Sequence, residues 1–262
     1  VMKGVILSIA PQVRLVDLTH SVPPQDVRRA ALILMNAAPY FPPDTVHLAV
    51  VDPGVGTERR PIAVRTGRGT FVGPDNGLFS FVLAEMETWT AVELREPAYR
   101  LPLVSTTFHG RDIFAPAAAH LASGVPVEAL GPVVNNLATL PLPRLEIGES
   151  SLEGEILYAD RFGNLVTSIG RFYRMDDTLM LTPVFRTGGK LAKGVVFPAE
   201  SARVIVAETE LRGIRRTYGE AARGELVALV GSSGFLEIAV REGSAAGRLG
   251  LPLGTPIRMT WR

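Results

Sequence analysis

The sequence predicts an α/β N-terminal domain with a central mixed sheet flanked by helices, followed by an all-β C-terminal domain that resembles a barrel. Helix-like and strand-like patterns alternate up to about residue 125, whereas strand-like patterns dominate after residue 145. The 26 glycines and 20 prolines fall between apolar segments and not in one block, which is typical of many short elements. We therefore expect domains at residues 1–130 and 145–262.

The elements of the first half follow from the spacing of apolar residues. Residues 25–38 carry one apolar stripe at helical spacing, and Pro39 ends the predicted amphipathic helix. Residues 45–51 are a short β-branched and apolar run, typical of a buried strand, and they lead into a loop that begins at Asp52. Two further helices are expected at residues 78–84 and 113–121.

The secondary structure of the second half is predicted from the proline and glycine residues that mark its linker and turns. Residues 131–144 are rich in proline, which favours an extended linker because proline cannot sit inside a helix or a central strand. Glycine-containing turns then separate a series of apolar, β-branched segments, so we expect a small barrel or sandwich. The predicted strands are residues 153–158, 165–169, 203–208, 225–230, 234–240 and 256–261.

The amino-acid composition argues against binding of nucleic acid, metal or membrane. The 27 Lys and Arg residues balance 26 Asp and Glu residues, so the net charge of +1 provides no field that would attract nucleic acid or an anionic bilayer. Cysteine is absent, and no pair of the 4 histidines has the spacing of metal ligands. No apolar run reaches the roughly 18 residues of a membrane helix. We expect a cytoplasmic protein that binds a small molecule and no metal, nucleic acid or membrane.

The loop from Asp52 to Arg60 is the first candidate for chemistry. It places a carboxylate at a strand end, two glycines that allow a ligand to approach the backbone, and two arginines. It lacks the lysine and the spacing of a phosphate-binding P-loop. A tight turn with a capping aspartate explains the same pattern, so the residues alone leave both interpretations open.

His109 is the second candidate, in a polar and aromatic segment just before a predicted helix. Asp112 is expected to cap or complement the N-terminus of that helix. A single histidine is more often structural, but His109 lies at the same kind of element boundary as the Asp52 loop. By contrast, His20 is expected in a turn bonded to itself, and His47 and His120 in structural positions.

Two glycine-containing segments of the second half, residues 160–167 and 231–240, are the third candidate. As patterns they are typical of hairpin turns. Their Asn, Ser and aromatic side chains would also suit a neutral heterocycle and an amino-acid carboxylate.

Six segments together resemble one known family. In chain order they are Asp17-Leu-Thr-His20, Val51-Asp-Pro-Gly-Val-Gly-Thr57, Val72-Gly-Pro-Asp-Asn-Gly77, Thr107-Phe-His-Gly-Arg-Asp112, Asp160-Arg-Phe-Gly-Asn164 and Ser232-Ser-Gly-Phe-Leu-Glu-Ile-Ala-Val240. The segments span nearly the whole chain and resemble the S-adenosyl-L-methionine (SAM) hydroxide adenosyltransferases, or SAM hydrolases. That family shares its fold with the SAM-dependent fluorinase and chlorinase.

The resemblance implies a catalytic triad of Asp52, Arg59 and His109 that activates water. A cation such as Arg59 would lower the pKa of the bound water, while His109 and Asp52 would orient it and accept its proton. The oxygen would attack the ribose C5′ in line and release adenosine and methionine. SAM is the substrate in this chemistry, and no cofactor is implied.

The resemblance also implies the residues that bind the substrate. Asp160, Phe162 and Asn164 would surround the ribose, methionine and adenine. Ser232 and Ser233 would lie toward the methionine end.

Four further residues complete the implied binding set. Glu237 and the backbone of Val240 would lie at the adenine edge. Gln25 stands where the fluorinase has tryptophan, and Phe108 precedes the triad histidine. Relatives form homotrimers whose sites lie between the N-terminal domain of one subunit and the C-terminal domain of the next, so a homotrimer is expected here.

Two alternatives to hydrolysis remain. One is a halide adenosyltransferase resembling the chlorinase, although the halogenating relatives have tyrosine in place of Asp52 and the fluorinase has serine in place of Gly110. Because a carboxylate at Asp52 repels a halide, water is the expected nucleophile. The other alternative is a non-catalytic module that binds adenosine or SAM.

The beginning of the chain departs from the family pattern. Relatives have a strand and an acidic loop ahead of the helix that matches residues 2–10, and an aspartate of that loop helps to hold the substrate. The chain starts at Val1 without them. The resemblance implies that a strand and a loop of about 20 residues precede Val1 in a protein whose site is complete.

Overall fold

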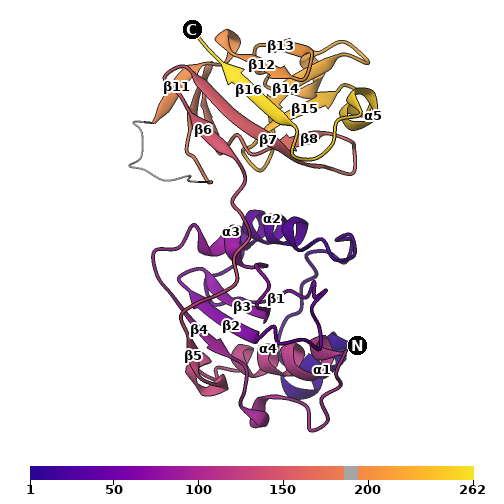
Figure 1. Ribbon diagram of the computed structural model, residues 1–262, viewed down its shortest axis with the longest axis vertical. Helices are drawn as coiled ribbons and strands as arrows, with labels where there is room; N and C mark the ends of the chain where they lie inside the picture. Colours follow the sequence, from indigo (N-terminus) through magenta and orange to yellow (C-terminus); the bar gives the residue numbers. More distant parts are fainter. Residues whose placement is uncertain (186–193) are drawn as a thin grey trace. The chain divides into compact units, whose positions relative to one another are not determined.

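The computed structural model describes residues 1–185 and 194–262, which form two units, Val1–Pro141 and Leu142–Arg262 (Figure 1). The division falls inside the proline-rich stretch at 131–144. That stretch is not wholly extended linker, because Val133–Val134 forms strand β5 and pairs with the last long strand of the first unit.

The first unit is built on a mixed sheet, as the sequence predicts. Strands β1 and β3 are parallel, and the other neighbouring pairs are antiparallel. The order across the sheet is β1 (Val46–Leu48), β3 (Gly69–Pro74), β2 (Pro61–Thr66), β4 (Trp89–Glu93) and β5.

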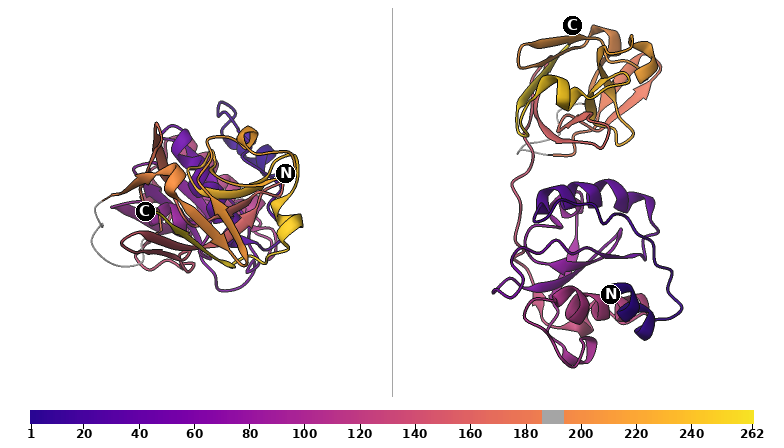
Figure 2. Two further views of the ribbon diagram at one scale, coloured as in Figure 1. Left: turned by 90° about the horizontal axis from the view of Figure 1, so that it is seen from above. Right: turned by 90° about the vertical axis from the view of Figure 1, so that its right-hand side faces the viewer.

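Helices cover both faces of this sheet. Figures 1 and 2 show α2 (Val27–Ala37) and α3 (Ser80–Leu83) on one face, with α1 (Met2–Ile9) and α4 (Ala115–Ala122) on the other. Helix α2 begins at Asp26, whose side chain accepts a hydrogen bond from the Arg29 amide. This cap satisfies one of the amides that a helix leaves unpaired at its start.

The predicted strand at 45–51 is only three residues long in the structure. The Ala49 amide still bonds to the Val72 carbonyl, but the chain then leaves the sheet and turns toward Asp52. Strands β2, β3 and β4 were not identified from the sequence, because their apolar runs are short and interrupted by arginine, threonine and glycine.

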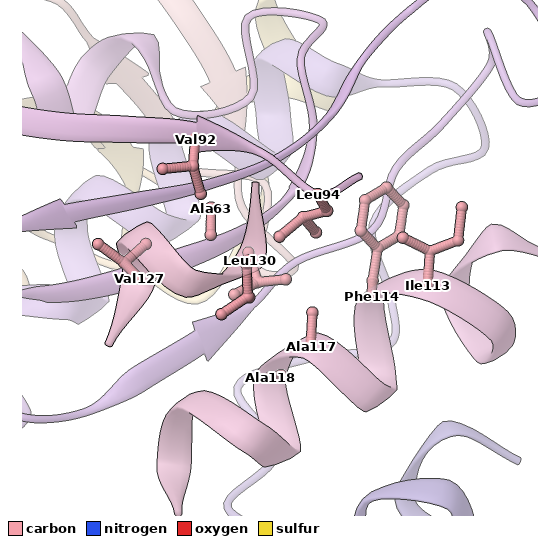
Figure 3. Close-up of a cluster of buried hydrophobic side chains, with 10 residues drawn as sticks. Ala63, Val92, Leu94, Ile113, Phe114, Ala117, Ala118, Val127 and Leu130 are labelled. Atoms are coloured by element: carbon pink, nitrogen blue, oxygen red, sulfur yellow. The ribbon is translucent and has the colours of Figure 1, made fainter. Parts of the chain in front are cut away.

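One buried apolar cluster joins the sheet to the segment that follows His109 (Figure 3). Phe114, at the end of a π-helical turn over Gly110–Phe114, packs in the same cluster as Ala63 and Val92 of strands β2 and β4. The remaining members are Val72, Leu94, Ile113, Ala117, Ala118, Val127 and Leu130. The loop that carries His109 is therefore anchored directly in the core.

The second unit is an antiparallel, nearly closed, barrel-like sheet, as predicted. The path across it is β13, β12, β16, β7, β8, β15 and β14, with β6 paired to β7. A bridge between Arg215, just after β13, and Leu229 in β14 brings the two ends of this path together. The bounds are β6 Leu145–Ile147, β7 Ser151–Ala159, β8 Leu165–Thr167, β12 Arg203–Val206, β13 Thr209–Arg212, β14 Leu226–Val230, β15 Leu236–Val240 and β16 Pro256–Thr260.

A smaller antiparallel sheet and one helix complete this unit. The smaller sheet has the order β11 (Val195–Pro198), β10 (Thr178–Leu181) and β9 (Phe172–Met175), and the helix is α5 (Ala245–Leu249). Among the helices of residues 1–185 and 194–262, none has the length and hydropathy to cross a membrane.

Leu130→Ala tests the role of the core cluster. The Leu130 side chain is 1% exposed, so its truncation is expected to lower the free energy of unfolding by about 2–5 kcal/mol. Urea denaturation measures this change. Leu103→Ala is the matched control, because Leu103 is 85% exposed and its loss is expected to change stability by less than about 0.5 kcal/mol. Equal effects of the two changes would contradict the packing described.

Candidate active site

Three side chains that are distant in sequence meet in the first unit. The Arg59 guanidinium donates from Nε to Asp52 Oδ1 at 2.8 Å and from Nη2 to Asp52 Oδ2, so the two residues form a bidentate ion pair. The same Nη2 lies 2.9 Å from His109 Nδ1. The structure therefore brings together all three residues of the predicted triad, with arginine in the middle.

Close packing of two loops makes this meeting possible. Gly56, in the Asp52 loop, has a φ of +79°, and a Cβ there would lie 2.6 Å from the Thr106 carbonyl oxygen. Only glycine combines this backbone conformation with this approach. The backbone at Asp52 forms a turn, since the Val55 amide bonds to the Asp52 carbonyl, while the Asp52 carboxylate pairs with Arg59.

The ion pair is largely shielded from water. The side chains of Arg59 and Asp52 are 8% and 7% exposed, and the guanidinium lies 5.2 Å from the ring centroid of the core residue Phe114. Within the part of the chain that the structure describes, Arg59 Nη1 is buried and has no hydrogen-bond partner. A buried donor without a partner is costly, so this nitrogen is suited to binding the oxygen of a ligand or of water.

The contact with Arg59 determines the protonation of His109. A guanidinium can only donate, so Nδ1 must accept, and the neutral ring then carries its proton on Nε2. Burial lowers the pKa of His109, and the Arg59 charge lowers it further, against the opposing effect of Asp52. His109 is thus neutral at neutral pH and offers an N–H from Nε2.

Asp112 lies in the first turn of the π-helix Gly110–Phe114, where an acidic residue complements the helix N-terminus as expected, but its side chain does not cap the helix. Its side chain is fully buried and accepts hydrogen bonds from the Ser105 amide at 2.8 Å and from Arg111 Nε at 2.5 Å. The bond from Arg111 holds the pKa of Asp112 below its usual range despite burial. Asp112 therefore closes the segment of residues 105–112 on itself and supports the position of His109 within it.

A second group of predicted residues lies in one turn of the other unit. Asp160 Oδ1 accepts from the amides of Phe162 and Asn164 at 2.8 and 2.9 Å. Asp160 Oδ2 accepts from Asn164 Nδ2 at 3.0 Å. Phe162 is 63% exposed, whereas Asn164 is buried, and the Arg161 guanidinium lies 4.7 Å from the centroid of the Phe162 ring.

Tyr218, which the sequence analysis missed, joins this turn to Glu237. Its hydroxyl donates to Glu237 Oε2 at 3.1 Å and lies 3.5 Å from Asn164 Nδ2. Glu237 is 7% exposed, and burial raises its pKa, while burial and the neighbouring Glu237 raise the pKa of Tyr218 to about 12. A glutamate in an otherwise apolar strand requires a donor, and that requirement is the signal that could have directed a search to Tyr218.

Gly231 makes room for the Glu237 carboxyl, because a Cβ at Gly231 would lie 1.7 Å from Glu237 Oε1. The turn after Gly231 carries Ser232, which is exposed, and Ser233, which is half-buried. Val240 is the last residue of β15 and is buried.

Two predicted binding residues lie in the first unit. Gln25 is exposed, with a φ of +67°, immediately before the capping Asp26. Phe108 is 47% exposed, and its ring centroid lies 4.8 Å from the Arg111 guanidinium. Phe108 is thus adjacent to the triad histidine in the chain and is accessible to a ligand.

The other histidines lie apart from the triad contacts. His20 Nε2 is 3.2 Å from Asp17 Oδ1 in its own turn, His47 stacks on Phe71 at 4.8 Å, and His120 meets the edge of Tyr99 at 5.0 Å. Across residues 1–185 and 194–262, no three or more His, Asp or Glu side chains gather as metal ligands.

Comparison with known proteins identifies the family. Residues 1–131 match the SAM hydroxide adenosyltransferase N-terminal domain, and residues 154–258 match the C-terminal domain of the same family. The chain belongs to the SAM hydroxide adenosyltransferase family. The two units therefore correspond to two domains that occur together in this family.

Relatives of this SAM hydroxide adenosyltransferase include hydrolases and fluorinases. An "(R)-S-adenosyl-L-methionine hydrolase" of Thermus thermophilus is 46% identical, and the match covers 99% of this chain and 92% of the relative. A fluorinase of Actinopolyspora mzabensis is 29% identical over 98% of this chain and 91% of its own length. A crystal structure of an uncharacterized conserved protein from Thermotoga maritima superposes with a TM-score of 0.83 at 34% identity, covering 99% and 93% of the two chains.

The titration of His109 tests the geometry of the triad. NMR of the ring is expected to show a pKa below the ordinary 6.5 and a proton on Nε2, with His109→Gln used to assign the signal. The neutral ring thus contributes stability that is present above about pH 6.5 and is lost as the pH falls through the lower folded-state pKa. In Arg59→Gln the pKa is expected to rise, because a cause of the lowering is removed. A wild-type pKa at or above 6.5 would contradict the contact.

Proposed function

We propose that this SAM hydroxide adenosyltransferase hydrolyses SAM to adenosine and L-methionine with Asp52, Arg59 and His109 as its catalytic residues. The observation that carries the proposal is the buried guanidinium of Arg59, which is held by Asp52 and retains one unpartnered nitrogen. The full-length similarity to hydrolases supports the choice of substrate. Because those relatives are named for the (R) form, we propose the (R)-sulfonium epimer as the form consumed.

The triad activates water through the charge of Arg59. Arg59 Nη1 donates to the oxygen, which favours the hydroxide form because a cation stabilises the developing charge. Asp52 uses one lone pair of each oxygen for Arg59 and accepts the water proton with another. His109 accepts from Arg59 Nη2 at Nδ1, so it holds the guanidinium in place and does not accept the proton of the water.

The displacement at the ribose C5′ needs no general acid. The water oxygen forms a bond to the ribose C5′ as the bond from C5′ to the sulfonium sulfur breaks, and its electron pair stays on sulfur. Methionine leaves as a neutral thioether, so nothing need protonate it. In-line placement and the shielding of the nucleophile from bulk water supply most of the rate enhancement.

The substrate is held by residues from both units in this proposal. Support comes from the family resemblance and from the exposed Phe162 ring and the Asn164 amide that share one turn. We further propose a homotrimer in which the two sets come from neighbouring subunits. The proposed binding residues are Gln25, Phe108, Asp160, Phe162, Asn164, Ser232, Ser233, Glu237 and Val240.

Water is preferred over halide in this site because of Asp52. A carboxylate beside the position of the nucleophile repels an anion. Arg59 already donates from Nε and Nη2 to that carboxylate, so these two nitrogens are not available to bind a halide. Gly110 offers no hydroxyl, and a Cβ there would lie 2.9 Å from Met2 Sδ. These features favour hydrolysis over halide transfer.

Incubation with SAM and excess chloride tests the reaction. We expect chromatography to show adenosine and methionine and no 5′-chloro-5′-deoxyadenosine, and we expect the (R)-epimer to be the one consumed. A chlorinated nucleoside would identify a halide adenosyltransferase instead. Binding of SAM in a calorimeter without any product would identify a non-catalytic module.

Asp52→Asn and His109→Ala are each expected to lower kcat at least about a hundredfold, because Asp52 accepts the proton of the water and His109 holds the guanidinium that polarises it. Adenosine binding, measured by calorimetry, should stay within about threefold of wild type. The matched control is His120→Ala, since His120 contacts Tyr99 and has no place in the triad. Normal turnover by His109→Ala would refute the triad assignment.

A further inference from the structure

Residues 72–77 carry the third motif of the family resemblance and follow strand β3 into a turn. Strand β3 lies between β1 and β2, parallel to the first and antiparallel to the second. The loop that carries Asp52 and Arg59 leaves from β1 and enters β2. Both ends of this loop therefore lie at the same edge of the sheet as the turn that follows β3.

Asn76 holds the start of the loop. Its Nδ2 donates to the Val51 carbonyl at 2.8 Å, one residue before Asp52. Its Oδ1 accepts from the Leu78 amide at 3.2 Å, which assigns the two ends of the side-chain amide because a backbone N–H can only donate. The bond to the Val51 carbonyl fixes the peptide plane that joins Val51 to Asp52.

Asp75 holds the end of the loop. Its amide donates to the Arg60 carbonyl at 2.9 Å, and its Oδ2 accepts from Arg60 Nε at 2.9 Å and from Arg60 Nη2 at 2.5 Å. Its Oδ1 accepts from the Ala138 amide at 2.8 Å, so both carboxylate oxygens have partners. The Asp75 side chain is 4% exposed, and charge-assisted bonds of this kind fix both partners in place. Arg60 directly follows Arg59 in the chain.

We propose that Asn76 and Asp75 are positioning residues that hold the two ends of the loop at residues 52–60 and thereby set the geometry of the Asp52–Arg59 pair. The inference rests on the proposed function, in which that pair activates water. Asn76 acts through the Val51 carbonyl and Asp75 through Arg60, so neither needs to contact the substrate. A displacement of about 1 Å at a catalytic group can lower a rate about a hundredfold.

The alternative role of Asn76 is to form a turn and nothing more. Asparagine often bonds to the amide two residues ahead, as Asn76 does to Leu78, and serine forms the same turn with a shorter side chain. Asn76→Ser keeps an acceptor for the Leu78 amide but has no donor that reaches the Val51 carbonyl. The turn role alone predicts a wild-type site in Asn76→Ser, whereas the positioning role predicts an altered one.

Steady-state kinetics with SAM and NMR of the His109 ring test the inference. Asn76→Ser and Asn76→Ala are each expected to lower kcat about tenfold and to leave KM within about threefold, because the proposed binding residues are untouched. Burial and the Arg59 charge lower the pKa of His109, so displacement of Arg59 is expected to move that pKa toward 6.5. Asn135→Ala is the matched control, because Asn135 is an exposed asparagine of the same unit, and it is expected to change neither quantity.

Asp75→Asn tests the other end of the loop, because it removes the charge that pairs with Arg60. It is expected to lower kcat and raise the pKa of His109 in the same way. Asp44→Asn is its control, since Asp44 is an exposed aspartate of the same unit. Asp75→Asn also takes the place of the Asn76 variants if circular dichroism shows that these do not fold.

The two measurements separate this inference from the proposed function. An unchanged His109 pKa in a folded Asn76→Ser overturns the inference, and so does an unchanged kcat or a rise in KM alone. A wild-type protein that consumes no SAM overturns the proposed function. The His109 pKa then decides the inference by itself, because it reports the position of Arg59 without any turnover.

Discussion

The site depends on one constraint, the burial of the Arg59 charge. A guanidinium that is 8% exposed requires a partner, and removing one member of a buried ion pair typically costs about 3–5 kcal/mol. Asp52 meets this need with two bonds, which also fixes the plane of the guanidinium. That plane sets the directions of Nη2 toward His109 and of the unpartnered Nη1. The hydrogen bonds that the triad can offer to a ligand therefore depend on how Asp52 orients the Arg59 guanidinium.

The core supports this arrangement from beneath. Phe114 belongs to the buried cluster of the first unit and also lies under the Arg59 guanidinium, so the packing of helix α4 on the sheet is continuous with the site. Asp112, two residues before Phe114, closes the loop that bears His109. Because a buried aspartate and a core phenylalanine flank the same π-helical turn, displacement of His109 would disturb both the core and a buried hydrogen bond.

The sequence predicted more of the site than of the sheet. The family resemblance, read from short motifs in a distinctive order, named Asp52, Arg59 and His109, and the structure brings these three side chains together. It also named Asp160 and Asn164, which share one turn. Strands β2 to β4 were missed because their apolar runs are short and interrupted by arginine, threonine and glycine, even though β2 and β3 pair as a tight hairpin. Tyr218 was missed because its two partners are 54 and 19 residues away in the chain. Of the two roles predicted for Asp112, capping is not seen because the Ser105 amide and Arg111 bond to its carboxylate, whereas its place in the first turn of the helix agrees with the prediction.

Hydrogen-bond direction is the property that residue identity alone could not supply. In the triad, a group that only donates makes His109 a donor at its far nitrogen. In the second unit, two acceptors make Asn164 an acceptor at its free end. In each case, a partner whose hydrogen-bonding role cannot change assigns the role of a group that could play either. Arginine can only donate and aspartate can only accept because of their charges. The Tyr218 oxygen acts as an acceptor toward Asn164 because its own proton is donated in a hydrogen bond to Glu237. His109, Asn164 and Tyr218 therefore each owe their hydrogen-bonding role to a neighbour.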